Sequence, residues 1–319
     1  MASKKKLKLK KGVKKRLFRL ILVLIVIILG IKGLSIYKYH QTYEYKLIQI
    51  GYTKEEANKL EDKISKEGIE NLLKDDSRDD DVLALVSEKY YLKRNYDLYL
   101  DYYKHNKSDS FEKIVAKVNA GAYREFYKDT QETDTSKDIL VLVNKYKVLT
   151  EDYEVNDLKK IPAEYSYGEV EAREECYNAY LKMAKAAKKD GISLIVTSGY
   201  RTYARQEEIY MEMRNSQGKR YADAYAARPG SSEHETGLAL DVFTYSATTE
   251  NFEKTETYKW LNKNAHKYGF IRRYEEGKAD ITGYSPESWH FRYLGVDTAT
   301  KVKNAGITYE EYYAYYIEK

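Results

Sequence analysis

Two short polar segments in the C-terminal half of the chain carry residues that can bind a metal ion. In the first, which ends at Asp241, a histidine and an aspartate stand seven residues apart, at His234 and Asp241. A strand over residues 238–243 presents Asp241 on the same face as its neighbours two residues away, and Gly237 lets the preceding loop fold back over that face. The spacing therefore predicts that both side chains reach one metal ion.

The second segment reads Glu287-Ser288-Trp289-His290 and follows directly after Pro286. It adds a third candidate ligand, His290. Two histidines, one aspartate and a fourth position open to water are the donor set of a catalytic zinc site. Glu287 is then a spare carboxylate, which we predict to be the general base that a hydrolytic zinc site requires.

A third segment, Ser198-Gly199-Tyr200-Arg201, lies upstream of these two. Taken in order, the motifs S-G-Y-R, S-x-H-x-x-G-x-A-x-D and E-x-W-H-x-R-Y resemble those of the zinc D-alanyl-D-alanine carboxypeptidases of the VanY type. The chain matches this pattern without a departure. The resemblance covers roughly residues 138–295 and does not reach the N-terminal part of the chain.

The resemblance implies a role for each residue of the site. His234, Asp241 and His290 are implied as zinc ligands, and Glu287 as the catalytic base. The substrate is implied to be a peptidoglycan stem peptide, whose terminal carboxylate and scissile carbonyl are held by Arg201, Gln206 and Ser232.

The residue types fit these implied roles. A carboxypeptidase must recognise a free carboxylate, and the guanidinium of Arg201 is a permanent cation whose planar fork matches one, with neutral donors beside it. A structural ion pair is the alternative interpretation of Arg201. Of the aromatic residues beside His290, we interpret Trp289 as pocket wall, in contact with substrate, and Tyr293 as core.

The expected activity is that of a zinc metallocarboxypeptidase that removes the C-terminal D-alanine from peptidoglycan stem peptides. Two alternatives stay open. The same motifs serve an L,D-carboxypeptidase that acts on the tetrapeptide stem, and a zinc-bearing, non-catalytic binding module would belong to a different class. The intact Glu287 argues against the binding module, because a purely structural zinc needs no spare base.

The elements around these segments predict an α+β domain over residues 138–319, with a largely antiparallel sheet and helices packed on one side. The single cysteine, Cys176, falls on the apolar face of a predicted helix and reads as a core residue rather than a nucleophile. Strands are expected at 139–143, 193–197, 238–243, 270–274 and 290–293, and helices at 172–187, 203–214, 251–268, 297–304 and 308–317.

Residues 41–135 are expected to be helical and carry no chemistry that we identify. Thr53 opens one helix with a capping box, and further helical stretches are expected at 81–105 and 110–123. We interpret this region as a stalk or small helical module, and wall binding by its tyrosines is the alternative. The polar run 130–137 is the predicted linker.

The chain begins with a basic tail and an apolar stretch. Residues 1–19 hold eight lysines and two arginines and no acid, and residues 20–37 carry one charge, at Lys32. A helix here is long enough to cross a bilayer, and positive charge stays in the cytoplasm, so we predict an uncleaved single-pass anchor with the catalytic domain outside the cytoplasm. A cleaved signal peptide is the alternative, although no A-x-A site follows.

Charge and cysteine content exclude several other classes. Beyond residue 19 the chain holds 45 basic and 50 acidic residues, so its body is mildly acidic and no nucleic-acid partner is expected. The expected partners are the stem peptide and the lipid bilayer. A single cysteine excludes an intramolecular disulfide framework and a cysteine-rich zinc module.

Overall fold

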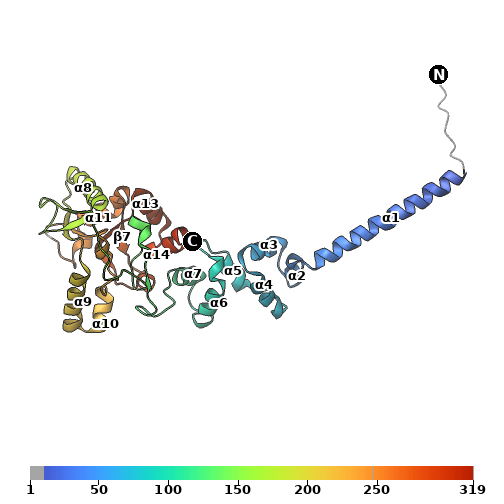
Figure 1. Cartoon of the computed structure of the whole chain (residues 1–319), viewed down its shortest axis with the longest axis horizontal. Coiled ribbons are helices and arrows are strands. Elements are labelled where there is room, and N and C mark those ends of the chain that lie inside the picture. The colour runs from blue at the N-terminus through green and yellow to red at the C-terminus, as the bar shows by residue number, and fades with distance from the viewer. Residues whose placement is uncertain (1–10, 246, 319) are drawn as a thin grey trace, which may run out of the picture. The chain divides into compact units, whose positions relative to one another are not determined.

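The structure is a computed structural model that describes residues 11–245 and 247–318. The chain separates into two compact units, and the division lies between Asp97 and Leu98. Figure 1 shows the course of the chain and the labels of its elements.

The first unit opens with the helix α1, which spans Lys11–His40 and has no buried residue. It is long and apolar enough to cross a membrane, a property that it shares with signal sequences near an N-terminus. The apolar stretch predicted at residues 20–37 lies inside this helix. Residues 1–10 of the predicted basic tail lie outside the described residues.

Short helices make up the rest of the first unit. The predicted capping box is present, because the Thr53 side chain accepts from the amide of Glu56 and the Glu56 carboxylate accepts from the amide of Thr53. The helix expected at 81–105 is instead broken in two, and the hydroxyl of the buried Tyr91, in the break, donates to the carbonyl of Lys63. The helices are α2 (Tyr43–Gln49), α3 (Lys54–Lys63), α4 (Lys66–Leu72), α5 (Asp80–Val86) and α6 (Tyr96–His105), which runs across the division.

The second unit is built on a four-stranded sheet with the strand order β5-β6-β8-β7. Each pair of neighbouring strands is antiparallel, which confirms the predicted fold class. Apolar residues of the sheet pack against two helices, α8 (Glu174–Lys189) and α11 (Glu256–Asn264), and form the main core. The strands are β5 (Ile195–Ser198), β6 (Ala239–Phe243), β7 (Phe270–Tyr274) and β8 (Glu287–Tyr293).

Helices lie around this sheet, with α8 and α11 at the top of the unit in Figure 1 and α9 and α10 at its bottom. Cys176, on α8, is fully buried in the core as predicted, and burial raises the pKa of its thiol far above the usual range. The helices are α7 (Phe111–Asn119), α8 (Glu174–Lys189), α9 (Tyr203–Gln217), α10 (Lys219–Tyr225), α11 (Glu256–Asn264), α12 (Ala279–Thr282), α13 (Val296–Ala305) and α14 (Tyr309–Tyr312). Two small sheets pair β1 (Gln131–Glu132) with β2 (Lys147–Val148), and β3 (Leu158–Lys160) with β4 (Glu171–Arg173).

The strand expected at 139–143 does not form, and this prediction is wrong. A short helical turn covers Thr135–Leu140, and the chain after it is irregular. The carbonyls of Ile139 and Val141 accept hydrogen bonds from Nη2 of Arg292, at 3.0 and 2.7 Å. A buried guanidinium therefore satisfies the polar backbone of this apolar run in place of a neighbouring strand.

The predicted linker at 130–137 also differs from the structure, because this run belongs to the second unit. The amide of Gln131 donates to the carbonyl of Tyr146 at 2.7 Å, and the Thr133 hydroxyl donates to the carbonyl of Leu142 at 2.5 Å. This polar run therefore forms hydrogen bonds with Leu142 and Tyr146 and is not a free linker. The division at Asp97 lies earlier in the chain than expected.

Candidate metal centre and substrate pocket

The three predicted ligands converge on one point of the sheet. Asp241 on β6 and His290 on β8 stand directly opposite each other in the strand register. His234 lies in a short helical turn, η4 (Glu233–Thr236), which ends at Gly237 with a φ of +67°. A Cβ at Gly237 would meet Cγ of Arg173 at 2.9 Å, so glycine is needed there both for its backbone angle and for space.

Hydrogen bonds orient the two imidazole rings. Nδ1 of His234 donates to the carbonyl of Gly199 at 2.7 Å, which leaves Nε2 as the atom that faces Asp241 Oδ1, 3.4 Å away. Nε2 of His290 lies 3.3 Å from Glu233 Oε2, and Nδ1 lies 3.3 Å from Asp241 Oδ1. Each ring therefore presents one nitrogen to the aspartate.

This donor set fits a zinc ion. One ligand atom from each of the three residues lies within 4.8 Å of the others. Oδ1 of Asp241 is buried and accepts no hydrogen bond, which is unfavourable unless a cation satisfies it. Two nitrogen donors and one oxygen donor suit zinc, and second hydrogen bonds from ligating histidines are a usual feature of such sites.

The pKa shifts show how charge is distributed at this centre. Burial, together with Arg201, lowers the pKa of His234 to about 4, so this ring is in the neutral form that can bind a metal. For His290, burial opposes charge, but the carboxylates of Asp241 and Glu233 beside the ring outweigh it and raise the pKa to about 9. The carboxylates of Asp241 and Glu233 therefore favour a positive charge among the three ligands, and a bound metal ion would supply that charge.

Glu233 is a site residue that the sequence reasoning missed. It is buried, and its Oε1 atom accepts from Nε of Arg273 at 2.8 Å and from Nη1 of Arg292 at 3.0 Å. Burial alone would raise its pKa, but these two arginines hold it far below the usual range, so Glu233 stays ionised and orients His290. In the sequence, only its position next to His234 indicated that Glu233 belongs to the site. Its contact with His290 could not be predicted, because His290 lies 57 residues further along the chain.

Glu287 stands beside the three donors without belonging to them. Its Oε2 atom lies 3.5 Å from Nδ1 of His290, and its side chain is 16% exposed. Burial raises its pKa to about 7, with His290 opposing this shift and Asp241 adding to it. A carboxylate with a pKa near neutrality can both accept and return a proton.

Arg201 follows β5 and is held by neutral groups on two sides. Its Nη2 and Nε donate to the Ser198 hydroxyl at 2.8 and 3.1 Å, and its Nη1 donates to Gln206 Oε1 at 3.2 Å. An ion pair with Asp241 Oδ2 is present at 3.4 Å. Since Asp241 also faces both histidines, the charge of Arg201 is only partly neutralised and can attract a substrate carboxylate.

All the predicted site residues line one pocket of about 220 Å³. Ser232 is buried in its wall, and Trp289 lines it while packing on Phe243. Tyr293 does not line the pocket and packs on Phe270, with ring centroids 5.3 Å apart. The structure therefore brings together the predicted ligands, base and substrate residues: His234, Asp241, His290, Glu287, Arg201, Gln206, Ser232 and Trp289.

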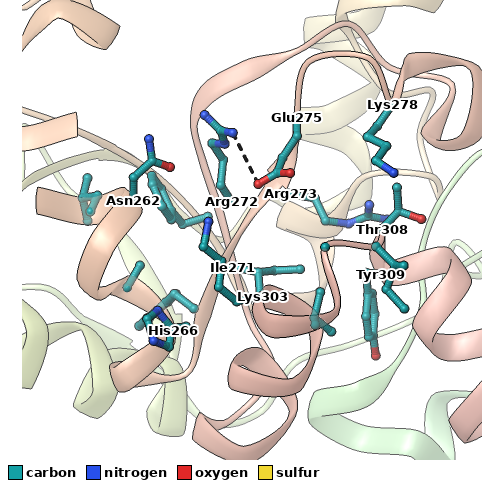
Figure 2. Close-up of a pocket in the computed structure, with 17 residues that line it drawn as sticks. Asn262, His266, Ile271, Arg272, Arg273, Glu275, Lys278, Lys303, Thr308 and Tyr309 are labelled. Carbon is teal, nitrogen blue, oxygen red and sulfur yellow. Dashed lines mark ion pairs between the residues drawn. The ribbon is translucent and has the colours of Figure 1, made fainter. Parts of the chain in front are cut away.

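A smaller cavity of about 90 Å³ lies against β7 and contains none of these residues. Figure 2 shows Arg272 on its wall, with the ion pair to Glu275, which measures 3.3 Å. The neighbouring Arg273 also lines it but donates to the buried Glu233. The predicted metal ligands, base and substrate-binding residues all line the larger pocket.

Comparisons with known proteins identify the family. The family model VanY, described as D-alanyl-D-alanine carboxypeptidase, matches residues 169–296. YodJ of Bacillus subtilis, whose name assigns it provisionally to the carboxypeptidases, is 39% identical over 202 residues, which cover 59% of this chain and 74% of YodJ.

Two solved structures are similar as well. The LdcB LD-carboxypeptidase shares 39% sequence identity at a TM-score of 0.55, covering 59% of this chain and 91% of that one. A variant of the vancomycin resistance D,D-pentapeptidase VanY, in complex with Zn(II), shares 35% identity at a TM-score of 0.48, covering 54% and 97%. All three predicted motifs fall inside the residues that the family model matches. The chain belongs to the VanY family of zinc D-alanyl-D-alanine carboxypeptidases.

Proposed function

We propose that the protein is a membrane-anchored zinc carboxypeptidase that removes the C-terminal D-alanine from peptidoglycan stem peptides. One observation carries this proposal. A single pocket holds a three-donor metal centre, a carboxylate that is not among the donors and a partly neutralised arginine. Family membership supports the same reaction.

In this proposal Arg201 binds the free carboxylate of the terminal residue. Its guanidinium has the planar geometry that carboxylates prefer, and Ser198 and Gln206 hold it in place. Ser232, which lines the same pocket, donates from its hydroxyl to the peptide. These contacts place the scissile carbonyl next to the metal centre.

His234, Asp241 and His290 are the proposed zinc ligands. Bound there, zinc supplies a Lewis acid that polarises the scissile carbonyl and makes a water molecule more acidic. Glu287 accepts the proton of the attacking water at its carboxylate and passes it to the amine of the departing D-alanine. Arg201, beside Asp241, adds positive charge that stabilises the oxyanion of the transition state.

An L,D-carboxypeptidase that acts on the tetrapeptide stem is the second candidate. The similarity to the LdcB LD-carboxypeptidase favours it, whereas the description of the family model favours D,D-activity. Both substrates end in a D-alanine with a free carboxylate. Arg201, with Ser198 and Gln206 that hold it, can bind this group in either substrate, and we call these three residues the carboxylate clamp. The residue before the scissile bond distinguishes them.

The N-terminal part of the chain is proposed to keep the enzyme at the cell membrane. The helix α1 would cross the bilayer, with the basic tail in the cytoplasm and the catalytic domain outside. The short helices that follow, α2 to α5, would act as a stalk or small helical module.

Zinc analysis and digestion of muropeptides test the proposal together. Purified protein should hold about one zinc ion per chain, as one catalytic site of this kind requires. Mass spectrometry should show that pentapeptide stems lose one alanine. Loss of alanine from tetrapeptides alone would favour the L,D-activity, and bound zinc without any cleavage would favour a binding module.

A further inference from the structure

A groove of about 330 Å³ lies next to the catalytic pocket and is flanked by Tyr167 and Tyr245. These side chains are 73% and 67% exposed, the largest values among the tyrosines that the structure describes. The sequence has 35 tyrosines, so exposure of some is expected, but the two most exposed line the same groove. Aromatic rings left in water at a concave surface are typical of a binding site.

The groove and the catalytic pocket share a wall. Phe243 lines the groove and Trp289 lines the pocket, and their rings stack with centroids 5.8 Å apart and planes 18° apart. Asp241 and Phe243 are two residues apart on β6, so they share a face of the strand. The groove therefore lies beside the pocket along β6.

The groove lies on the side of the catalytic pocket away from Gln206 and α9. Gln206 of the carboxylate clamp is on α9. Tyr245 lies near α8, because it also lines a further cavity together with Ala184 and Lys188 of that helix. Figure 1 shows α8 and α9 at opposite sides of the second unit. A peptide whose terminal carboxylate is at Arg201 and whose chain runs away from α9 would extend towards the groove.

The length of a stem peptide matches this separation. From Asp241 to Tyr245 the chain advances four residues, which is at most about 13 Å at roughly 3.3 Å per residue. In a pentapeptide stem, four residues separate the scissile bond from the sugar that bears the peptide, and these span at most about 14 Å. A fully extended stem is therefore long enough for its sugar to reach the groove.

We propose that this groove binds the amino sugar to which the stem peptide is attached, an inference that rests on the proposed function. The faces of Tyr167 and Tyr245 offer the C–H groups of a pyranose ring an apolar surface. Threonine hydroxyls on the same wall can donate to and accept from sugar hydroxyl and acetamido groups, and they belong to Thr197, Thr244 and Thr249.

Two substrates test the proposal on the full-length protein: a free pentapeptide, and the same pentapeptide carried by its disaccharide. The wild type should cleave the disaccharide form with the higher kcat/KM. Tyr167→Ala and Tyr245→Ala should each lower this kcat/KM roughly two- to tenfold, the range expected for one aromatic contact, and leave the free pentapeptide unaffected. Tyr167→Phe and Tyr245→Phe retain the ring and should keep most of the preference.

Tyr316→Ala is the matched control, because Tyr316 is 47% exposed and lines neither cavity. Equal kcat/KM for both substrates in the wild type, or equal losses on both in the tyrosine variants, would overturn the sugar site. A wild type that cleaves neither substrate contradicts the proposed function instead. Calorimetry with the disaccharide peptide then tests whether the groove binds the sugar. Weaker binding of this peptide to the variant that carries both Tyr167→Ala and Tyr245→Ala supports the sugar site, and unchanged binding overturns it.

Discussion

His234 and His290 each use one ring nitrogen for a hydrogen bond and turn the other towards Asp241. Removing either ring leaves two protein donors, which are too few to hold a catalytic zinc ion. We expect His234→Ala and His290→Ala to lose zinc, and Asp241→Asn to bind it more weakly, as measured by metal analysis after dialysis. Stoichiometric zinc in a variant without both histidines would show that the metal binds elsewhere.

Glu287 can be separated from the ligands by a substitution that keeps its size. Glu287→Gln removes proton acceptance while the carboxamide still fills the space beside His290, so zinc content should match the wild type. Turnover of the cleaved stem peptide should fall by at least about 10²-fold, the lower end of what a positioned general base contributes. Steady-state kinetics with metal analysis on the same preparation check this, and wild-type turnover in the variant would refute the assignment.

Arg201 is proposed both to bind the substrate carboxylate and to stabilise the oxyanion, and kinetics show which of these roles contributes more. Arg201→Lys keeps the positive charge but loses the planar fork that contacts Ser198 and Gln206. If Arg201 binds the substrate carboxylate, KM should rise roughly tenfold or more while kcat stays similar. Equal losses in kcat and kcat/KM would instead place its charge at the oxyanion.

At the scale of elements, Lys145 joins segments that form the pocket walls. Its Nζ donates to the carbonyls of Asp223 on α10 and of Gly283 after α12, and lies 4.3 Å from the ring centroid of Tyr284, a residue of the pocket. Lys145 is 2% exposed and makes no ion pair within the described residues. Burial lowers the pKa of its ammonium group to about 8.

This shift predicts how stability depends on pH. Between pH 8 and about 10.5 the unfolded chain keeps a proton on Lys145 that the folded chain releases, so the free energy of unfolding gains a positive slope with pH. Below pH 8 both states bind the proton and the slope vanishes. Lys145→Met lacks the titrating group, so the wild type should gain stability relative to this variant between pH 8 and 10 in urea unfolding. Parallel curves for the two proteins would contradict the prediction.

At the scale of the whole molecule, α1 is the proposed membrane anchor of the enzyme. The proposed anchor predicts that the protein sediments with membranes and is released by detergent but not by high salt, because an apolar helix of this length is retained by the hydrocarbon core. Protease added to intact protoplasts should degrade its C-terminal domain. A soluble secreted product whose N-terminus lies beyond residue 30 would establish a cleaved signal peptide instead.

The chemistry of the site was predictable from the sequence alone. Histidine, aspartate and glutamate occur in short motifs that resemble those of the VanY family, and each motif is contained within a few residues. The same holds for the capping box at Thr53 and for the sheet strands other than 139–143. The fold class followed from the local pattern of elements, and the family and the zinc-dependent hydrolase followed from the resemblance of the motifs.

Other features depended on partners far away in the chain, and only the tertiary structure decided them. Glu233 meets His290 across 57 residues, and Arg292 reaches the carbonyl of Val141 across 151 residues, replacing an expected strand by a guanidinium contact. The groove beside Tyr167 and Tyr245 likewise joins residues from separate segments. Pattern and propensity describe interactions between near neighbours, whereas these contacts exist only once packing has brought distant segments together.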